Sequence, residues 1–284
     1  MADCVVCGRL QRHLFDYRNF QYLRCPSCGL VSTYPIPDEH TIKRHYASKF
    51  QCGNYQLLRE FRSRYRVIYD DMADVIQRVR TDLRGLRVLD VGCFTGDFLE
   101  VMASRGCEVY GVELQDDAVA EANRKFPGHV FKVDVAATEF PDQRFDVITL
   151  LAVIEHVIDP ERLLRGAIDR LKPGGLIVIE TPNSGSLMAR IMRRQWPPYA
   201  PVEHIHLFTE RALRIVLDRA GVRSFRRRRH WKRLPLSYVL PMLENFSPGL
   251  SRVVTPLYRI LPRGVRELAL PMYIGEMIIL GSKS

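Results

Sequence analysis

The sequence 87-RVLDVGCFTGDF-98 decides the fold. A short apolar run ends at Gly92, a second glycine follows at Gly96, and a helical pattern begins at Asp97. An apolar strand that leads through a glycine-containing turn into a helix is typical of an open parallel α/β sheet, in which ligands bind at the carboxyl ends of the strands. The spacing D-x-G-x-x-x-G does not match the G-x-G-x-x-G of a pyrophosphate cradle. The acidic residue before the turn, Asp90, favours a cationic or amine-bearing ligand.

The alternation of apolar strands and amphipathic helices continues beyond this turn. Strands are expected at residues 107–114, 129–135, 144–154, 176–183 and 272–283, and helices at 97–106, 115–126, 159–175 and 209–221. Apolar strands that alternate with helices predict a parallel sheet that is covered on both faces. The expected fold class is therefore α/β, a Rossmann-like, doubly wound and mostly parallel sheet of seven strands.

Length and composition are those of an ordinary globular protein. The chain has 284 residues, of which 46% are hydrophobic and 26% are charged, and these values exclude a mostly disordered chain, a collagen-like chain and a coiled coil. The N-terminus lacks the apolar core of a signal peptide. No apolar run approaches the roughly 18–20 residues of a membrane-spanning helix. We therefore expect a cytoplasmic protein.

Four of the seven cysteines form two C-x-x-C pairs near the N-terminus, Cys4 with Cys7 and Cys25 with Cys28. An odd number of cysteines spread along the chain is a poor disulfide framework, whereas two C-x-x-C turns direct four thiolates to one tetrahedral metal site. The pattern predicts a small zinc ribbon that holds a structural Zn²⁺ with no open coordination position. Redox activity of the cysteine pairs is the alternative.

These features divide the chain into four segments. The zinc ribbon occupies residues 1–38, a helical linker and first helix occupy 39–80, the ligand-binding core occupies 81–234, and an apolar, proline-rich insert with the closing strand occupies 235–284. Five prolines lie between residues 235 and 262, so no long helix is expected there.

The net charge of +10 is concentrated in one part of the chain. Residues 188–234 contain thirteen Lys and Arg against three Asp and Glu, which accounts for the whole excess. A basic surface favours an anionic partner such as nucleic acid, a phosphorylated substrate or a lipid headgroup. The alternative is an ordinary solvated face.

Two acidic residues follow the next predicted strands. Glu113 ends the second strand, 21 residues after Gly92, at a position where a carboxylate accepts hydrogen bonds from both ribose hydroxyls of a nucleoside. Asp134 ends the third strand, where an adenine amino group could be bound. Together with the glycine turn, these residues indicate a pocket for a nucleoside that has no phosphates and a positively charged tail.

Five sequence motifs resemble, in order, those of class I S-adenosylmethionine-dependent methyltransferases, and most closely the branch with the ubiquinone-biosynthesis O-methyltransferases. They are VLDVGCFTGDF, GVEL, VDV, FDVITLLAVIEHVIDP and LKPGGLIVIETPN, and they span about residues 85–222. The resemblance implies that residues 81–234 bind S-adenosylmethionine and that the cofactor is lined by Asp90, Gly92, Cys93, Gly96, Glu113, Leu114, Asp134, Val135 and Leu151. A Rossmann-like domain that has lost its ligand is the alternative.

Three histidines are candidates for the catalytic chemistry that the resemblance implies. The family reaction is an in-line methyl displacement, in which the protein aligns the nucleophile and removes its proton. His156, just after the fourth strand, fits a general base, or it orients the loop. His204 and His206 are two residues apart, so in an extended segment they would share a face as base or substrate binders. The alternative is a segment that only packs and caps.

One position departs from the ubiquinone-type enzymes. They have an acid three residues before the position of Glu155, where this chain has Ala152. A divalent metal at the catalytic centre is therefore not expected.

The whole arrangement also resembles bacterial zinc-ribbon methyltransferases. In some sugar C-methyltransferases a similar N-terminal module helps to close the substrate site, so Tyr46, which follows the ribbon, is a candidate for a role there. The expected reaction is methyl transfer to a hydroxyl or carbon of a small molecule, a sugar or secondary metabolite. One alternative is an RNA methyltransferase that uses the basic residues 223–233. Another is a membrane-peripheral enzyme, with residues 235–275 as an interfacial lid, that acts on a lipid-linked substrate.

Overall fold

The computed structural model contains the expected seven-stranded sheet. It describes residues 2–38, 40–42, 44–45, 62–137, 144–235, 240, 248–266 and 268–283, so Tyr46 lies outside the described residues. The sheet has the order β10-β11-β8-β7-β4-β5-β6. Its strands are β4 (Arg87–Val91), β5 (Glu108–Val112), β6 (Val130–Phe131), β7 (Phe145–Leu151), β8 (Leu171–Pro182), β10 (Ser224–Pro235) and β11 (Ala269–Ser282). Only the pairings of β11, with β8 and with β10, are antiparallel among these strands. The predicted mostly parallel, Rossmann-like fold is confirmed.

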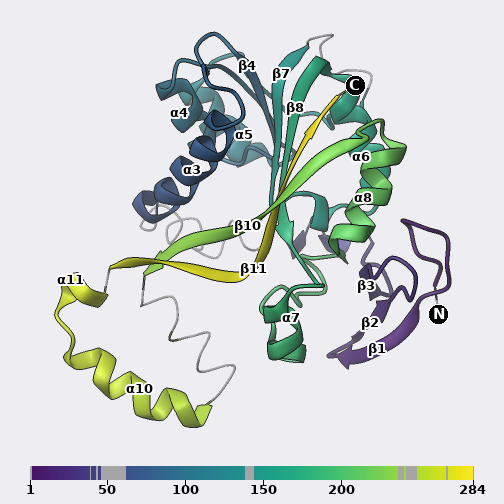
Figure 1. Cartoon of the computed structure of the whole chain (residues 1–284), viewed down its shortest axis with the longest axis vertical. Helices are drawn as coiled ribbons and strands as arrows, with labels where there is room; N and C mark the ends of the chain where they lie inside the picture. Colours follow the sequence, from purple (N-terminus) through teal and green to yellow (C-terminus); the bar gives the residue numbers. More distant parts are fainter. Residues whose placement is uncertain are drawn as a thin grey trace.

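Helices cover both faces of this sheet (Figure 1). One face carries α3 (Arg62–Gln77), α4 (Asp97–Ser104) and α5 (Asp116–Lys125), and the other carries α6 (Pro160–Asp169) and α8 (Glu210–Arg219). Each face has its own apolar core. Met72, Phe98 and Ala122 belong to one cluster, and Leu164 and Leu213 belong to the other. Burial on both faces explains why the central strands are mainly apolar.

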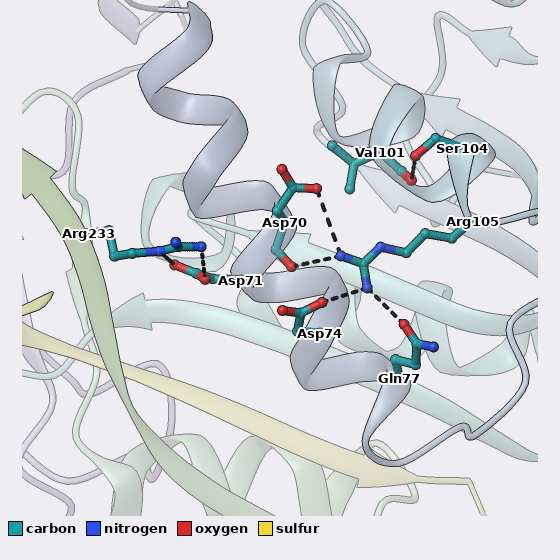
Figure 2. A network of polar contacts seen from close by, with 8 residues as sticks. All are labelled: Asp70, Asp71, Asp74, Gln77, Val101, Ser104, Arg105 and Arg233. Atoms are coloured by element: carbon teal, nitrogen blue, oxygen red, sulfur yellow. Dashed lines mark hydrogen bonds and ion pairs between the residues drawn. The ribbon is translucent and has the colours of Figure 1, made fainter. Parts of the chain in front are cut away.

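Helix α3 is attached to the core by ion pairs at both sides (Figure 2). Arg105, which follows α4, reaches the carboxylate of Asp74 at 2.7 Å and the backbone carbonyl of Asp70 at 3.2 Å. On the other side, Arg233 of β10 binds the carboxylate of Asp71 through two nitrogens. These contacts fix α3 beside α4 and against the edge of the sheet.

The N-terminal module is a small antiparallel sheet that docks on the core. Strands β1 (Arg12–Tyr17), β2 (Phe20–Arg24) and β3 (Val31–Tyr34) are joined by a fourth strand from the core, β9 (His206–Leu207). The hydroxyl of Thr209, which caps α8, donates to the carbonyl of Cys28 at 2.6 Å, and Arg219 donates to the carbonyl of Val6 at 2.7 Å. The ribbon therefore fixes the segment that leads into α8.

Three sequence expectations differ from the structure. A helix, α10 (Pro248–Ile260), lies in the segment from which long helices were excluded, and the short helix α11 (Arg263–Arg266) follows it. The exclusion was wrong because Pro248 stands at the start of α10, where no N–H is needed, and Pro256 is tolerated inside it. The third parallel strand, β6, has only two residues. Helix α6 ends at Asp169, before the predicted Pro-Gly-Gly stop, which lies within the bounds of β8.

Three further short helices lie after β7 and β8. They are α7 (Leu187–Met192) and the 3-10 turns η2 (Ile154–His156) and η3 (Arg193–Gln195). None of the described helices has the length and apolar character needed to span a membrane.

Candidate active site and metal centre

The turn after β4 has the backbone shape of a ligand cradle. Gly92 and Gly96 both adopt left-handed backbone angles, with φ of 74° and 77°. A Cβ at Gly92 would lie 2.7 Å from Cγ2 of Val153, so no other residue fits between this turn and the loop after β7. The chain thus passes closely over the carboxyl ends of β4 and β7, where ligands bind in this fold.

Glu113 projects at the end of β5, beside this cradle. Its two carboxylate oxygens accept hydrogen bonds from the backbone N–H groups of Phe94, Leu114 and Gln115, at 3.0, 2.7 and 3.0 Å. These bonds hold the carboxylate between the glycine turn and the start of α5. Leu114 itself is 65% exposed, so its side chain is open to a ligand. The glycine cradle and this fixed acceptor fit the ribose and methionine parts of S-adenosylmethionine, which carries hydroxyl and ammonium donors.

The other predicted cofactor residues lie at different depths. The carboxyl of Asp90 is buried and accepts a hydrogen bond from Thr149, and its burial raises its pKa to about 7. Cys93 is also buried, and its sulfur packs against the backbone of Gly111. Both side chains therefore point into the core, whereas the backbone of the turn faces the cradle.

Two predicted residues follow β6 and one ends β7. Asp134 is half-buried and pairs with Arg162 at 2.8 Å, while Val135 is buried in the apolar core. Leu151 is partly buried beside the cradle, at the end of β7. The residues predicted around the cofactor thus lie at or just after the carboxyl ends of four neighbouring strands.

His156 and His204 come together beyond the end of β7. Their ring centres are 4.9 Å apart. The Nδ1 of His156 lies 2.7 Å from the carbonyl of Glu203, and the Nδ1 of His204 lies 2.6 Å from the carbonyl of Pro198. A carbonyl only accepts, so both Nδ1 atoms carry a proton, and the neutral form of each ring has its lone pair on Nε2. Burial and the neighbouring His156 lower the pKa of His204, which keeps it neutral.

Glu155 completes this cluster, although it is not among the site residues predicted from the sequence. One carboxylate oxygen accepts from Thr181 at 2.9 Å, and the other lies 3.9 Å from Nε2 of His156. The side chain is 1% exposed, and burial raises its pKa to about 7. Glu155, His156 and His204 each place a ligand or base atom within 4.8 Å of the others. The sequence does contain a signal for it, since Glu155 is an acid directly before the candidate base His156. It was used above only to locate Ala152, three residues earlier.

His206 lies outside this cluster. We expected it to share a face with His204, but His204 lies in a turn whose amide binds the carbonyl of Ala200, and strand β9 begins only at His206. The ring of His206 is fully buried between the hydroxyl of Ser32 and the carbonyl of Ile158, at 3.0 and 3.3 Å. Its burial lowers its pKa to about 4. It joins the ribbon to the core.

The four N-terminal cysteines form a compact sulfur cluster. The sulfur atoms of Cys4 and Cys28 are 3.5 Å apart, those of Cys7 and Cys25 are 3.3 Å apart, and those of Cys7 and Cys28 are 3.7 Å apart. A tetrahedral zinc with Zn–S bonds of about 2.3 Å requires sulfurs about 3.8 Å apart. Cys7 is half-buried and the other three are buried. The cluster therefore fits a closed, structural Zn²⁺ site.

We expect a chelator to release about one zinc ion per chain and to unfold the ribbon, because a structural zinc site of this type depends on its metal for folding. Limited proteolysis should then cut within residues 2–38 while the core stays protected. Cys25→Ser should behave like the chelated protein, and Cys107→Ser, a half-buried cysteine of the core, should behave like the unmodified one. A zinc content well below one per chain would contradict this assignment.

Comparison with known proteins identifies the family. A family model for a methyltransferase domain matches residues 60–224, which is more than half of the chain. The chain belongs to this methyltransferase family. Its fold also matches solved methyltransferases. One is a magnesium protoporphyrin IX methyltransferase from Synechocystis with bound S-adenosylhomocysteine, with a TM-score of 0.56 and 16% identity over 87% of this chain and 100% of that one. Another is an S-adenosylmethionine-dependent methyltransferase from Thermotoga maritima, with a TM-score of 0.54 and 19% identity over 84% of this chain and 99% of that one.

Curated relatives cover a smaller part of the chain. A ubiquinone biosynthesis O-methyltransferase from Pseudomonas fluorescens SBW25 is 38% identical over 111 residues, which are 37% of this chain and 47% of that protein. The chain thus matches about half the length of these relatives. The family and the fold together confirm the predicted class, a class I S-adenosylmethionine-dependent methyltransferase.

Proposed function

We propose that this enzyme transfers a methyl group from S-adenosylmethionine to a hydroxyl or carbon of a small molecule, a sugar or secondary metabolite. The observation that supports this most is the pair of histidines, His156 and His204, beside the carboxyl end of β7, each with its Nδ1 bound to a backbone carbonyl. Such an acceptor must lose a proton as it attacks, and an imidazole with its lone pair on Nε2 is suited to take it. The curated relatives are O-methyltransferases of a small molecule.

The roles of the site residues follow from their positions. Bound S-adenosylmethionine supplies a methyl group that is already activated by the sulfonium charge. Gly92 and Gly96 allow the backbone to approach the cofactor, and Glu113 accepts hydrogen bonds from its ribose. His156 accepts the proton of the acceptor at Nε2. The neighbouring carboxylate of Glu155, when ionised, stabilises the imidazolium that forms.

A lipid-linked acceptor is a second candidate because of α10. Val253, Leu257 and Ile260 lie one helical turn apart and are 63%, 58% and 78% exposed. Arg252 and Arg259 stand on the same helix, which Figure 1 shows projecting away from the sheet. Exposed apolar side chains beside arginines are typical of a helix that lies on an anionic membrane.

A methyl-transfer assay tests these proposals together. The zinc-loaded protein receives S-adenosylmethionine with a labelled methyl group and a cell extract, and the products are separated into an aqueous small-molecule fraction, an organic lipid fraction and nuclease-sensitive polymer. We expect the label in the small-molecule fraction. Label mainly in the lipid fraction would replace the proposal with the lipid-linked one, and label in nuclease-sensitive material would support the RNA alternative.

Glu113→Gln supplies the loss-of-function comparison. Hydrogen bonds to a charged group contribute about 1.5–3 kcal/mol each, so loss of the charge is expected to weaken cofactor binding at least tenfold. Glu108→Gln removes the same charge from the start of the same strand, where the side chain is 45% exposed, and is expected to bind the cofactor normally. Equal binding by both variants would remove Glu113 from the cofactor site.

A further inference from the structure

A cleft on the ribbon side of the core is lined by five arginines among its residues. Its volume is about 730 Å³, and it lies between the second cysteine turn of the ribbon, the starts of α7 and α8, and strands β10 and β11. It shares no residue with the glycine cradle or the histidine cluster. The arginines come from four separate elements and their flanks: Arg24, Arg190, Arg211, Arg227 and Arg229.

Contacts between the ribbon and the core fix the shape of this cleft. The hydroxyl of Thr209 binds the carbonyl of Cys28, and Gly29 packs so closely that a Cβ there would lie 2.9 Å from the Thr209 methyl group. This contact fixes the floor of the cleft between ribbon and core. At the wall, the guanidinium of Arg229 lies over the ring of Tyr273, 5.8 Å from its centre.

Charge in the cleft is largely uncompensated. Glu210 is the one acidic residue that lines it among the described residues, and its carboxylate already pairs with Arg227 at 2.7 Å and with Arg214 at 3.7 Å. Within the described part of the chain, Arg190 and Arg211 contact no carboxylate. Several cations that converge on one cleft repel one another, and a bound polyanion removes this repulsion.

We propose that this cleft binds an organic phosphate, with its phosphate groups on the arginines. Guanidinium groups bind phosphate oxygens through paired hydrogen bonds. The volume falls in the range of about 300–1,000 Å³ that small-molecule sites occupy, well above the size of one phosphate group. Tyr273, Leu187 and Met188 line the same cleft and offer apolar and aromatic surface to the organic part. The site is independent of methyl transfer and is tested by binding alone.

Inorganic pyrophosphate is the probe, titrated calorimetrically into the zinc-loaded full chain at about 0.15 M salt, where non-specific attraction is screened. Arg211→Gln with Arg229→Gln is expected to weaken its binding at least tenfold. Arg226→Gln with Arg228→Gln removes the same number of charges, both from β10 at exposed positions outside the cleft, and is expected to change the binding less than twofold. All four side chains are exposed, so both variants should fold, and their melting temperatures and zinc contents serve as the check.

Three results would overturn the proposal. The first is no pyrophosphate binding to the unmodified protein below millimolar concentration. The second is an equal loss in both double variants, which would show general attraction to a basic surface. The third is tighter binding of a single-stranded RNA that both double variants weaken alike, which would make the basic segment a nucleic-acid surface. None of these results bears on methyl transfer, so they are distinguishable from a failure of the proposed function.

Discussion

Replacing Lys232 with methionine is expected to lower the free energy of unfolding by about 3–5 kcal/mol, because it leaves two buried carboxylates without their shared cation. The ammonium of Lys232 lies 2.9 Å from Glu180 and 2.5 Å from Glu276, and the exposed fractions of the three side chains are 16%, 7% and 12%. His230 lies 3.1 Å from the same oxygen of Glu180.

The pKa shifts in this cluster show which charges depend on one another. Burial opposes charge on Lys232, but the two carboxylates raise its pKa above the ordinary value. Burial likewise opposes charge on Glu180, and Lys232 with His230 holds its pKa well below the ordinary value. The carboxylates raise the pKa of His230 to about 8 despite its burial. Removal of the lysine therefore leaves a net negative charge in the sheet.

Chemical denaturation measures the free energy of unfolding of Lys232→Met, and two further variants serve as controls. Lys172→Met removes a lysine that pairs with Asp146 and is 40% exposed, and is expected to cost about 1 kcal/mol or less. Adding Glu276→Gln to Lys232→Met is expected to recover more than half of the loss, since one carboxylate then remains for His230.

The loss should also shrink at low pH. Without the lysine, burial raises the folded-state pKa of the carboxylates above the unfolded value. The resulting penalty on the fold grows as the pH rises from the unfolded pKa to the folded one and is constant above it. Lys232→Met is therefore expected to be closer to the unmodified protein at pH 5 than at pH 8. A difference that is the same at both pH values, or no larger than that of Lys172→Met, would contradict the buried-charge account.

The sheet and the ribbon could be predicted because each depends on a local pattern. The turn 92–96 and the two C-x-x-C pairs fix their own backbone geometry, whatever the rest of the chain does. The Lys232 cluster could not be predicted in this way. Its members stand on β8, β10 and β11, and they meet through the pairing of strands that are distant in sequence, with Glu276 opposite His230 and Ile278 opposite Glu180.

The candidate active site likewise combines one residue that a local pattern predicts with one that distant pairing brings in. His156 follows directly from its position after an apolar strand, but its partner His204 is brought in by the docked ribbon. The amide of Thr33 binds the carbonyl of Ile205, and the Thr33 hydroxyl lies 3.4 Å from the carbonyl of His204. Pairing between strands so distant in sequence leaves no local signal, so a ribbon that looks separate in the sequence is structurally part of the site.

His156→Gln is expected to lower kcat for methyl transfer by about 10²–10⁴-fold, the usual contribution of a general base. His156 is accessible to an acceptor, since its side chain is 23% exposed, and its Nε2 lies 3.9 Å from the carboxylate of Glu155. His204 packs beside His156 and is expected only to position it, so His204→Gln should lower kcat about tenfold. Retention of more than a tenth of kcat by His156→Gln would contradict the base assignment.

The pH profile separates a base from a residue that only positions another. The carboxyl of Glu155 has a pKa raised to about 7 by burial, so it gains its negative charge as the pH rises through 7. That charge, 3.9 Å from Nε2 of His156, makes the imidazole a stronger base, so kcat/KM is expected to rise through the same pH. Glu155→Gln should abolish this rise and leave the zinc content unchanged, and His204→Gln should keep it. The carboxylate can act only when the base is present, so His156→Gln should lower kcat and also abolish the rise of kcat/KM with pH. Added imidazole should restore part of kcat in this variant.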